Sequence, residues 1–523
     1  GKEVVEVYYN PPYTNGGIEK ASANLIGFAK TSELAPGASE NVTVTFKAED
    51  MASYDTYGKG CYVLEKGDYV ISINADSHTV LDSKVYTVAS DIVYDASNKR
   101  ESDVEVADNK FDFAEGNVTY LSRANGFANY AEATAAPADF ELPAEAKATF
   151  YNNSNWNPED FNNADDVAPT TGAKNGLKLE DMVGVDYNDA QWDTFLDQLT
   201  VSDMDKLIAL GGFQTAAVDS IGKVQAIDCD GPASINNNFT RQGSIGFPSA
   251  VMIAATWNTE LAHDFGTSIG KMADDMNVSG WYAPAMNIHR SAFAGRNFEY
   301  YSEDGILMGL IDARETVGIQ SKGVYVYNKH FVLNDQENNR AGIGTWCNEQ
   351  ALREIYLRAF ELPIVQADAQ CVMTAFNRLG AIWAGAYTEL LTDWLRGEAG
   401  MSGFAVTDMY DGTYMVKVNE IVAGNDLPDN FVGDDISELK DYGPDGAKAN
   451  PMVAQALRTS AKRVLNTVVN SRGMDGISQY TRVVREATWW QLTLNIAQWA
   501  LGALTAAAFV LVVLDGKKKG AKK

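Results

Sequence analysis

Short runs of β-branched and aromatic residues, several of them alternating with polar ones, dominate residues 1–90. Neighbouring side chains of a β-strand point to opposite faces, so this alternation predicts strands with one buried face. Turn-forming stretches such as LAPGASE and EKGD separate the runs. We therefore predict a β-sandwich over residues 1–90. The runs are EVVEVYY (3–9), NVTVTF (41–46), DYVISINA (68–75) and SKVYTV (83–88).

Residues 91–180 carry weaker signals for regular structure. SNKRESD and TAAPADFELPAEAKA are polar, and the second contains several prolines and alanines, while NNSNWNPEDFNNADD is rich in asparagine. Such composition is typical of loops. We predict that this segment is a connector lying over a neighbouring domain.

From residue 181 to 475 the pattern changes to near-continuous apolar runs that alternate with longer amphipathic stretches. Continuous apolar runs are expected for strands buried on both faces of a parallel sheet. Residues 258–276 and 348–368 place apolar residues at helical spacing. The alternation predicts an α/β fold, specifically a TIM-like (β/α)8 barrel. No GxGxxG motif follows a strand, which disfavours a nucleotide-binding sheet. The expected strands are VQAID (224–228), AVMIAAT (250–256), WYAPAM (281–286), GVYVYNKHF (323–331), CVMTAFN (371–377) and GFAVTD (403–408).

Polar or charged residues follow most of these strands. In a parallel barrel the carboxyl ends of the strands form the active-site face. Carboxylate, guanidinium and ammonium groups gathered there suit a polyhydroxylated ligand, and one carboxylate is then placed to attack an anomeric carbon. The set comprises Asp228, Asp230, Asn287, His289, Arg296, Lys329, His330, Asn377, Arg378 and Asp408.

The motifs around these residues resemble glycoside hydrolase family 3. DGPA, NIHR, GRNFEYYSED, KHF, TAFNRLG and GFAVTD occur in the family's order, and the resemblance covers roughly Leu199 to Asp429. The N-terminal runs resemble the fibronectin-III-like module of the same family. The resemblance implies retaining hydrolysis of terminal non-reducing β-D-glucosyl residues.

The resemblance also implies a role for individual side chains. Asp408, which ends GFAVTD, is the expected nucleophile, and Asp230 is expected to bind the outer hydroxyls of the sugar. Because a nucleophilic carboxylate must stay ionised, Arg296 and Lys329 are expected to keep the pKa of Asp408 low. The remaining hydroxyls are assigned to Arg296, Lys329 and His330, with Arg340 as a further candidate, and Met373 and Tyr414 are expected to line the pocket.

Three features separate this chain from common family patterns. Met409 stands where many members carry Trp, which changes the expected contact with the leaving group. KHFVLNDQENNR has no second histidine, which disfavours the β-N-acetylglucosaminidase branch. DGPA favours a glucosidase over a xylosidase.

The general acid/base is the third and largest departure. Family β-glucosidases usually take this glutamate from an α/β-sandwich domain after the barrel, whereas here an apolar C-terminal segment follows. The resemblance therefore implies a domain-shuffled order, with the missing domain and the start of the N-terminal sandwich upstream of Gly1 or on a partner chain. Within the chain, Glu299, Glu303 and Glu337 are candidates, and Glu299 is expected to support Arg296.

Residues 476–523 are predicted to comprise a juxtamembrane segment, a transmembrane helix and a basic tail. Residues 496–514 (IAQWALGALTAAAFVLVVL) contain no charge. At ~1.5 Å per residue such a helix spans roughly 28 Å, close to the thickness of a bilayer core. Trp489, Trp490 and Trp499 lie near its start, where the headgroup layer favours indole rings. The lysines that follow (517, 518, 519, 522 and 523) predict a cytoplasmic tail and an extracellular catalytic domain.

Net charge and metal-binding patterns narrow the choice of partners. The formal charge is −28, which disfavours nucleic acid as a partner. The four cysteines and four histidines show no metal-binding spacing, so neither a metal nor a cofactor is expected. The expected ligand is a small carbohydrate.

Other functions stay open at this point. The chain is alternatively a β-xylosidase or another exo-glycosidase of the same family. It is also interpretable as a non-catalytic, membrane-tethered sugar-binding protein. A third hypothesis, an unrelated aldolase-type barrel, requires Lys329 to form a Schiff base.

Overall fold

The computed structural model describes residues 1–136, 139, 141–152, 155–163, 165–430, 438–477 and 489–520 of the chain. It divides into two compact units, Gly1–Gly476 and Ile477–Lys523. Residues 478–488 of the predicted juxtamembrane segment, and Lys522 and Lys523 of the predicted tail, lie outside the described residues.

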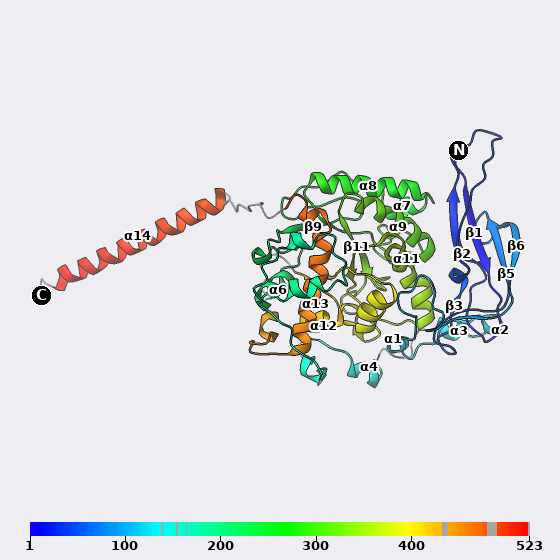
Figure 1. The fold of residues 1–523 in the computed structure, drawn as a ribbon, viewed down its shortest axis with the longest axis horizontal. Helices are drawn as coiled ribbons and strands as arrows, with labels where there is room; N and C mark the ends of the chain where they lie inside the picture. Colours follow the sequence, from blue (N-terminus) through cyan, green and yellow to red (C-terminus); the bar gives the residue numbers. More distant parts are fainter. Residues whose placement is uncertain are drawn as a thin grey trace. The chain divides into compact units, whose positions relative to one another are not determined.

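The N-terminal part of the first unit is a β-sandwich (Figure 1). Aromatic and apolar side chains of both sheets, among them Val7, Tyr54 and Tyr69, form its core. On the other face of its larger sheet, Tyr8 and Leu25 join the core of the barrel. One sheet has the order β2-β1-β5-β6, with β1 (Val4–Asn10), β2 (Asn24–Lys30), β5 (Gly67–Asn74) and β6 (Val80–Val88), and the other has the order β3-β4-β7, with β3 (Ser53–Tyr54), β4 (Tyr62–Leu64) and β7 (Ile92–Tyr94).

Two local predictions for the sandwich differ from the structure. Residues 41–46 keep the alternation of burial but form no strand, although Val44 and Phe46 pack on the sandwich core. Strand β2 was not predicted, because NLIGFAK shows no clear alternation of apolar and polar residues. The sandwich itself is present, as expected from the remaining runs.

The connector packs on the barrel through backbone hydrogen bonds; its start, Ile92–Tyr94, is strand β7 of the sandwich, and the α-helices among its described residues are short. The N–H groups of Val104 and Glu105 donate to the carbonyls of Glu398 and Gly397, at 2.8 and 3.0 Å. The N–H of Phe111 donates to Glu349 at 2.6 Å. The short helices are α1 (Asp112–Glu115), α2 (Ala124–Phe127), α3 (Tyr130–Ala133) and α4 (Ala144–Ala148).

The second part of the first unit is a seven-stranded sheet surrounded by helices (Figure 1). Six neighbouring strands are parallel, and β8 pairs antiparallel with β9 at one edge. The order is β17-β16-β13-β11-β10-β9-β8, with β8 (Gln214–Thr215), β9 (Ala226–Asp230), β10 (Gly280–Tyr282), β11 (Tyr325–Phe331), β13 (Cys371–Thr374), β16 (Ala405–Met409) and β17 (Leu427–Asp429).

Helices cover the outside of this sheet. Helices α8 and α9 approach closely because Gly266 and Gly318 lack side chains: a Cβ at these positions would lie 2.1 Å from the carbonyl oxygen of Glu315 and 2.4 Å from that of His263, respectively. The main helices are α6 (Val201–Ala209), α8 (Thr259–Asp275), α9 (Gly305–Gln320), α11 (Leu357–Ala367), the π-helix η7 (Glu389–Glu398), α12 (Lys417–Ala423) and α13 (Pro451–Val469).

The prediction of eight parallel strands is not met by the described residues, because the run AVMIAAT forms a helix, α7 (Ala250–Ala254). Ala250, Ile253 and Ala254 are buried at helical spacing, whereas Val251 and Met252 are 37% and 59% exposed. A short apolar run does not distinguish a strand from a helix, and alanine favours the helix.

The two edges of the sheet meet without pairing as strands in the described residues. A Cβ on Gly212, just before β8, would lie 1.5 Å from the carbonyl oxygen of Asn430, just after β17. Only glycine permits this approach. The sheet is therefore strongly curved, and the segments next to its two edge strands lie close together.

The second unit contains one long helix, α14 (Trp489–Gly520). It includes the predicted transmembrane residues 496–514 and has a mean hydropathy of 2.0 in its most apolar window. Its length and composition are sufficient to cross a membrane.

Candidate active site

Three strands of the sheet bring charged side chains together at their carboxyl ends. Asp230 ends β9, Lys329 and His330 lie near the end of β11, and Asp408 lies near the end of β16. Lys329 Nζ donates a hydrogen bond of 2.8 Å to Asp230 Oδ1, although β10 lies between their strands. The predicted gathering of polar groups at this face is thus present.

Asp230 is the more accessible of the two site aspartates, with 52% of its side chain exposed. Burial of the carboxyl raises its pKa, but the charge and hydrogen bond of Lys329 outweigh that effect, and the net shift of the pKa is downward. The N–H of Gly231 also donates to Asp230 Oδ1, at 2.8 Å. An ionised, half-exposed carboxylate of this kind is a good acceptor for paired hydroxyl groups.

Asp408 has one occupied and one free carboxylate oxygen. Its side chain is 15% exposed. Oδ1 accepts a hydrogen bond of 2.8 Å from the N–H of Met409. Oδ2 has no hydrogen-bond partner among the described residues, and it lies 3.5 Å from His330 Nε2. A buried carboxylate oxygen without a partner is costly unless it has a chemical use.

The pKa of Asp408 corrects one expectation. Burial raises the pKa of this carboxyl above its ordinary value of 3.8. Arg296, the Met409 N–H, Lys329 and Arg340 all lower it, but they do not cancel the cost of burial. The expected cations are therefore present, but the pKa of Asp408 is raised overall because desolvation is the largest effect.

His330 is a neutral group beside this carboxylate. Burial lowers its pKa well below the ordinary value, and the charges of Arg296 and Lys329 lower it further. Asn334 Nδ2 donates to the Tyr300 hydroxyl at 3.1 Å, and that hydroxyl lies 3.1 Å from His330 Nδ1. Nδ1 also lies 3.4 Å from Asn287 Oδ1, so this ring nitrogen faces Tyr300 and Asn287, while Nε2 faces Asp408.

The two arginines are oriented by glutamates. Arg296 Nε pairs with Glu299, as expected. Burial lowers the pKa of this guanidinium, but Tyr300, Glu299 and Asp408 raise it more strongly, so the net shift of the pKa is upward. Arg340 Nη1 donates to Glu337 at 2.8 Å, and its guanidinium lies over the ring of Phe376. Both arginines act electrostatically on Asp408. Neither glutamate therefore has a free carboxylate.

The two predicted lining residues lie at the same face. Met373 is buried in β13 and is paired in register with Lys329. The Tyr414 hydroxyl donates to the carbonyl of Phe376 at 2.9 Å, and the charge of Asp408 contributes to its raised pKa. Met409, at the Trp position of the family, is 43% exposed beside the nucleophile.

Other strand-end residues have structural roles instead. Asp228 lies inside the barrel, where it accepts hydrogen bonds from the Tyr325 and Tyr327 hydroxyls at 2.7 and 2.6 Å. Asn287 exchanges two hydrogen bonds with the backbone of His330. Arg378 donates to the carbonyls of Ala381 and Tyr151.

Asn377 and His289 also bind backbone carbonyls rather than facing the site. Asn377 Nδ2 donates to Val332 at 3.0 Å, and His289 Nε2 lies 3.0 Å from the carbonyl oxygen of Tyr300. Glu303 lines a separate cavity of about 250 Å³ that also includes Tyr9 and Tyr62 of the sandwich. In the described ranges no cluster of three metal-binding side chains is present.

Asp429 was missed by sequence reasoning. It ends β17, pairs in register with Met409, and is 4% exposed. Burial raises its pKa well above the ordinary value, and the charge of Asp408 raises it further. Its strand has only three residues and contains Pro428, so it gives almost no strand signal. The clue available in the sequence was Asp429 itself, an aspartate that closely follows the apolar Leu427.

The fold and the site define a class: an α/β protein with a free carboxylate, a neutral histidine and ion-paired cations at the carboxyl ends of a parallel sheet. Comparison with known proteins is consistent with this class. Residues 229–423 match the glycosyl hydrolase family 3 N terminal domain, and residues 3–77 match the fibronectin type III-like domain. These matches make the chain similar to members of glycosyl hydrolase family 3 over its barrel and its sandwich.

Curated relatives include two bacterial proteins named as β-glucosidases. The chain is 32% identical to β-glucosidase A of Butyrivibrio fibrisolvens over 456 residues, covering 82% of this chain and 51% of the relative. It is 31% identical to a β-glucosidase of Ruminococcus albus over 429 residues, covering 78% and 42%. The chain thus spans about half the length of these relatives.

A solved structure shows the same fold. A β-glucosidase from Paenibacillus barengoltzii superposes with a TM-score of 0.70 at 24% identity, covering 93% of this chain and 53% of that one. The similarity includes both the sandwich and the barrel, since it extends over nearly the whole chain.

Proposed function

We propose that the chain is the barrel-bearing part of a retaining β-glucosidase, with Asp408 as nucleophile. The observation that carries this proposal is the free Asp408 Oδ2 at the carboxyl ends of the strands. The names of the curated relatives support glucose over xylose as the sugar. A sugar-binding protein without activity has no need of a buried carboxylate oxygen with no partner.

In the first step Asp408 Oδ2 attacks the anomeric carbon, and the bond from that carbon to the leaving-group oxygen breaks. The leaving oxygen takes a proton from a general acid, and a glucosyl ester of Asp408 remains. Water then attacks the same carbon, gives its proton to the now deprotonated acid, and releases Asp408 as a carboxylate. Arg296 and Lys329 are proposed to hold sugar hydroxyls, together with Asp230.

The general acid/base is proposed to come from outside the described residues, on an upstream α/β-sandwich domain or a partner chain. Glu299 and Glu337, two of the in-chain candidates, are paired with Arg296 and Arg340. Glu303 lies at the cavity next to the sandwich. None of the three carboxylates is therefore available at the sugar.

A mechanism-based label tests the nucleophile. Dinitrophenyl 2-deoxy-2-fluoroglucoside has a leaving group that needs little protonation, so it reacts even without the general acid. We expect peptide mass spectrometry to find the fluoroglucosyl group on Asp408. Asp408→Asn should abolish labelling, whereas Asp264→Asn, at an exposed position of α8, should not. A label on any other residue contradicts the proposal.

The corresponding fluoroxyloside separates the glucosidase from the xylosidase. It lacks the hydroxymethyl group of glucose but keeps the same leaving group. We expect the glucoside to label Asp408 faster. Equal or faster labelling by the xyloside would favour the alternative.

The second unit is proposed to anchor the protein in a membrane, with the first unit outside the cell and the lysine-rich end in the cytoplasm. Support comes from the length and hydropathy of α14 and from Lys517, Lys518 and Lys519 at its end. Cytoplasmic ends of membrane helices are enriched in lysine and arginine.

A further inference from the structure

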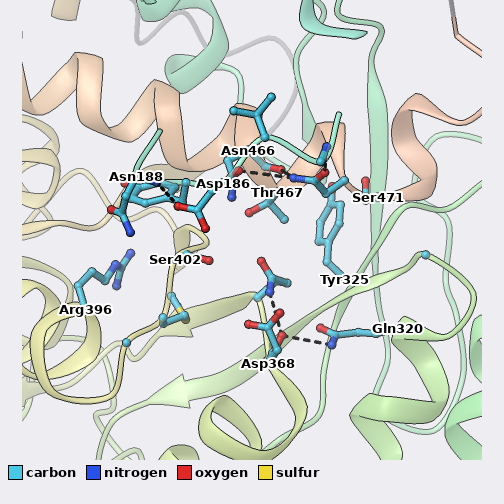
Figure 2. Close-up of a pocket in the computed structure, with 18 of the residues that line it drawn as sticks. Asp186, Asn188, Gln320, Tyr325, Asp368, Arg396, Ser402, Asn466, Thr467 and Ser471 are labelled. Carbon is cyan, nitrogen blue, oxygen red and sulfur yellow. Dashed lines mark hydrogen bonds between the residues drawn. The ribbon is translucent and has the colours of Figure 1, made fainter. Parts of the chain in front are cut away.

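A cavity of about 770 Å³ lies at the amino ends of β11, β13 and β16 (Figure 2). Several of its polar side chains bind the backbone around them: Gln370 Nε2 donates to the carbonyl of Asp368 at 2.9 Å, and Asn470 Nδ2 donates to that of Asn466 at 3.0 Å. Its lining mixes donors and acceptors and indicates no particular ligand. The free edge of the sandwich, in contrast, indicates a partner.

Strand β6 forms this edge (Figure 1). It pairs with β5 on one side, and no other described strand pairs with it. Each of its residues from Val80 to Thr87 is exposed. The outer side of an edge strand presents a row of backbone N–H and C=O groups that can pair with a further strand.

The side chains of β6 protect this edge only weakly. Proteins usually shield an edge strand with charged side chains, proline or a short length. Strand β6 has nine residues and no proline, and Asp82 and Lys84 are its only charged side chains. Leu81 and Val85 are 66% and 60% exposed, and Tyr86 is exposed as well. Such a strand is expected to be covered by another strand.

The order of side chains along β6 fits a second copy of the same strand. If two copies pair antiparallel about Ser83, Asp82 of each copy lies opposite Lys84 of the other. Leu81 of each copy then lies opposite Val85 of the other. Opposite charges and apolar side chains that face each other across two strands stabilise an antiparallel pair.

The neighbouring register is unfavourable. Pairing about Lys84 would place the two Lys84 side chains against each other, and like charges in that position are destabilising. The register between β5 and β6 shifts before Asp82, which leaves Leu81 as an extra residue at a bulge. The strand is regular from Asp82 onward, so the pairing of Asp82 with Lys84 does not depend on the bulge.

We propose that two copies of this chain associate through β6, so that their four-stranded sheets join into one continuous sheet. The observation that carries the proposal is the self-complementary sequence of a free, exposed edge strand. A contact one strand wide is smaller than the ~1,200–2,000 Å² that stable complexes bury, so the dimer is expected to be reversible. It forms whether or not Asp408 hydrolyses a sugar.

Sedimentation equilibrium of the full chain in a density-matched detergent measures the association. We expect a monomer–dimer equilibrium. Asp82→Lys and Lys84→Asp each place like charges at both ionic pairs, so each variant alone should dimerise about tenfold more weakly. An equimolar mixture of the two variants has opposite charges at both pairs again. It should therefore dimerise with about the affinity of the parent.

Cysteine cross-linking tests the register. The four native cysteines are buried, so an introduced surface cysteine reacts alone. Ser83→Cys should give a disulfide-linked dimer on mild oxidation, because the two copies of this residue face each other. Thr87→Cys is the matched control: it is exposed on the same strand, but its two copies lie roughly 26 Å apart in the proposed register. It should stay monomeric.

Three results would overturn the proposal. The first is a full chain that sediments as a monomer at every concentration. The second is a dimer that the single charge variants leave unchanged, or that their mixture does not restore, since α14 or another surface then holds the two copies together. The third is a Thr87→Cys variant that cross-links as readily as Ser83→Cys.

Discussion

Asp408 illustrates how one residue balances burial against ionisation. Its carboxyl must be charged to attack a sugar, yet burial raises its pKa. Arg296 is the first of the groups that lower it. The neutral His330 adds no positive charge, since its own pKa is lowered well below the ordinary value. Activity at acidic pH therefore depends on the neighbouring arginine.

The first prediction concerns the pH dependence of labelling by the fluoroglucoside. Only ionised Asp408 reacts, so the rate should rise with pH through a midpoint above 3.8, the ordinary value for aspartic acid. Arg296→Gln removes a charge that lowers this pKa, so the midpoint should move to higher pH. Rates at saturating inhibitor separate this shift from weaker binding. A midpoint that moves to lower pH would contradict the assignment of Asp408.

The second prediction concerns stability. Because the folded-state pKa of Asp408 is raised, its contribution is full below the unfolded-state pKa and is lost as pH rises through the folded one. Asp408→Asn should therefore raise the thermal midpoint at neutral pH, and the gain should shrink in acid. Differential scanning calorimetry measures both. Asp264→Asn, at an exposed position, should change little. A lower midpoint for Asp408→Asn would show that the carboxylate is not desolvated.

Sequence reasoning selected side chains that lie near one another, because the strand ends of a parallel sheet converge. It chose Asp230, Lys329 and Asp408 from their places after apolar runs, and the structure brings them together. It did not separate Asp228 from Asp230, since both point into the barrel and only depth distinguishes them. The hydroxyls of Tyr325 and Tyr327, which bind Asp228 inside the barrel, belong to a different strand.

Among the elements, helix α9 buries two carboxyl groups against the barrel. Asp312 is fully buried and accepts a hydrogen bond of 2.5 Å from Asn328 Nδ2. Glu315, one turn further on, accepts a hydrogen bond of 2.6 Å from the Tyr301 hydroxyl. Burial raises the pKa of Asp312 to about 8 and that of Glu315 well above its ordinary value. Asp312 is therefore largely protonated at neutral pH.

The third prediction follows for Asp312→Asn. The raised folded-state pKa means that Asp312 stabilises most below the unfolded-state pKa of about 4, and this contribution falls as pH rises through about 8. Asparagine has no such dependence. The unfolding free energy of the variant relative to the parent should therefore increase by about 1 kcal/mol or more across that range. Urea titrations at several pH values measure it, and a constant difference would contradict the buried-acid interpretation.

One of the buried ion networks that join the connector to the barrel is centred on Arg353. Arg353 is 1% exposed, and it contacts Glu398 at 2.6 and 3.0 Å and Glu349 at 2.7 Å. It also donates to the carbonyl of Asp108 in the connector at 2.6 Å. Glu349 in turn accepts from the N–H of Phe111. A segment with little regular structure is thereby held in a single position.

The fourth prediction tests this network. Arg353→Ala removes the cation of Glu349 and one of the two cations of Glu398, the other being Lys110, and should destabilise the first unit by about 3–5 kcal/mol in urea unfolding. Arg314→Ala is the matched control, because its pair with Glu260 is largely exposed and should cost less than about 1 kcal/mol. Equal effects of the two variants would show that the buried network does not hold the connector.

At this scale, long amphipathic elements were predicted well and short ones were not. Residues 258–276 form α8 as expected, since a pattern of several turns specifies a helix. AVMIAAT was predicted as a strand but forms α7, because a run of five to seven apolar residues shows no clear helical or strand periodicity. The short strands β8 and β17 were not predicted, because so few residues carry no clear period either. Tertiary contacts, rather than local sequence, decide such segments.

For the whole molecule, the buried cores lie in the first unit, and the described side chains of α14 are exposed. Apolar side chains of the first unit pack among themselves, whereas Phe509 and Leu511 of α14 are 69% and 67% exposed. An exposed apolar helix of this length is stable in a bilayer rather than in water.

The fifth prediction compares the full chain with a chain that ends at Gly476. The shorter chain should remain in the supernatant without detergent and unfold at an unchanged thermal midpoint. The full chain should sediment with lipid vesicles. Sedimentation of the shorter chain, or a full chain that stays soluble without lipid, would contradict the membrane proposal.

The close approach at Gly212 links the shape of the barrel to the state of its nucleophile. Phe213, the next residue, hydrogen-bonds through its backbone to the Asp429 carboxyl on the opposite edge, and the charge of Asp408 raises the pKa of that carboxyl. Esterification of Asp408 removes its charge, so Asp429 then releases its proton at a lower pH. The proposed bond between Asp408 and the sugar would thus change the protonation of Asp429, whose carboxyl binds the backbone next to Gly212.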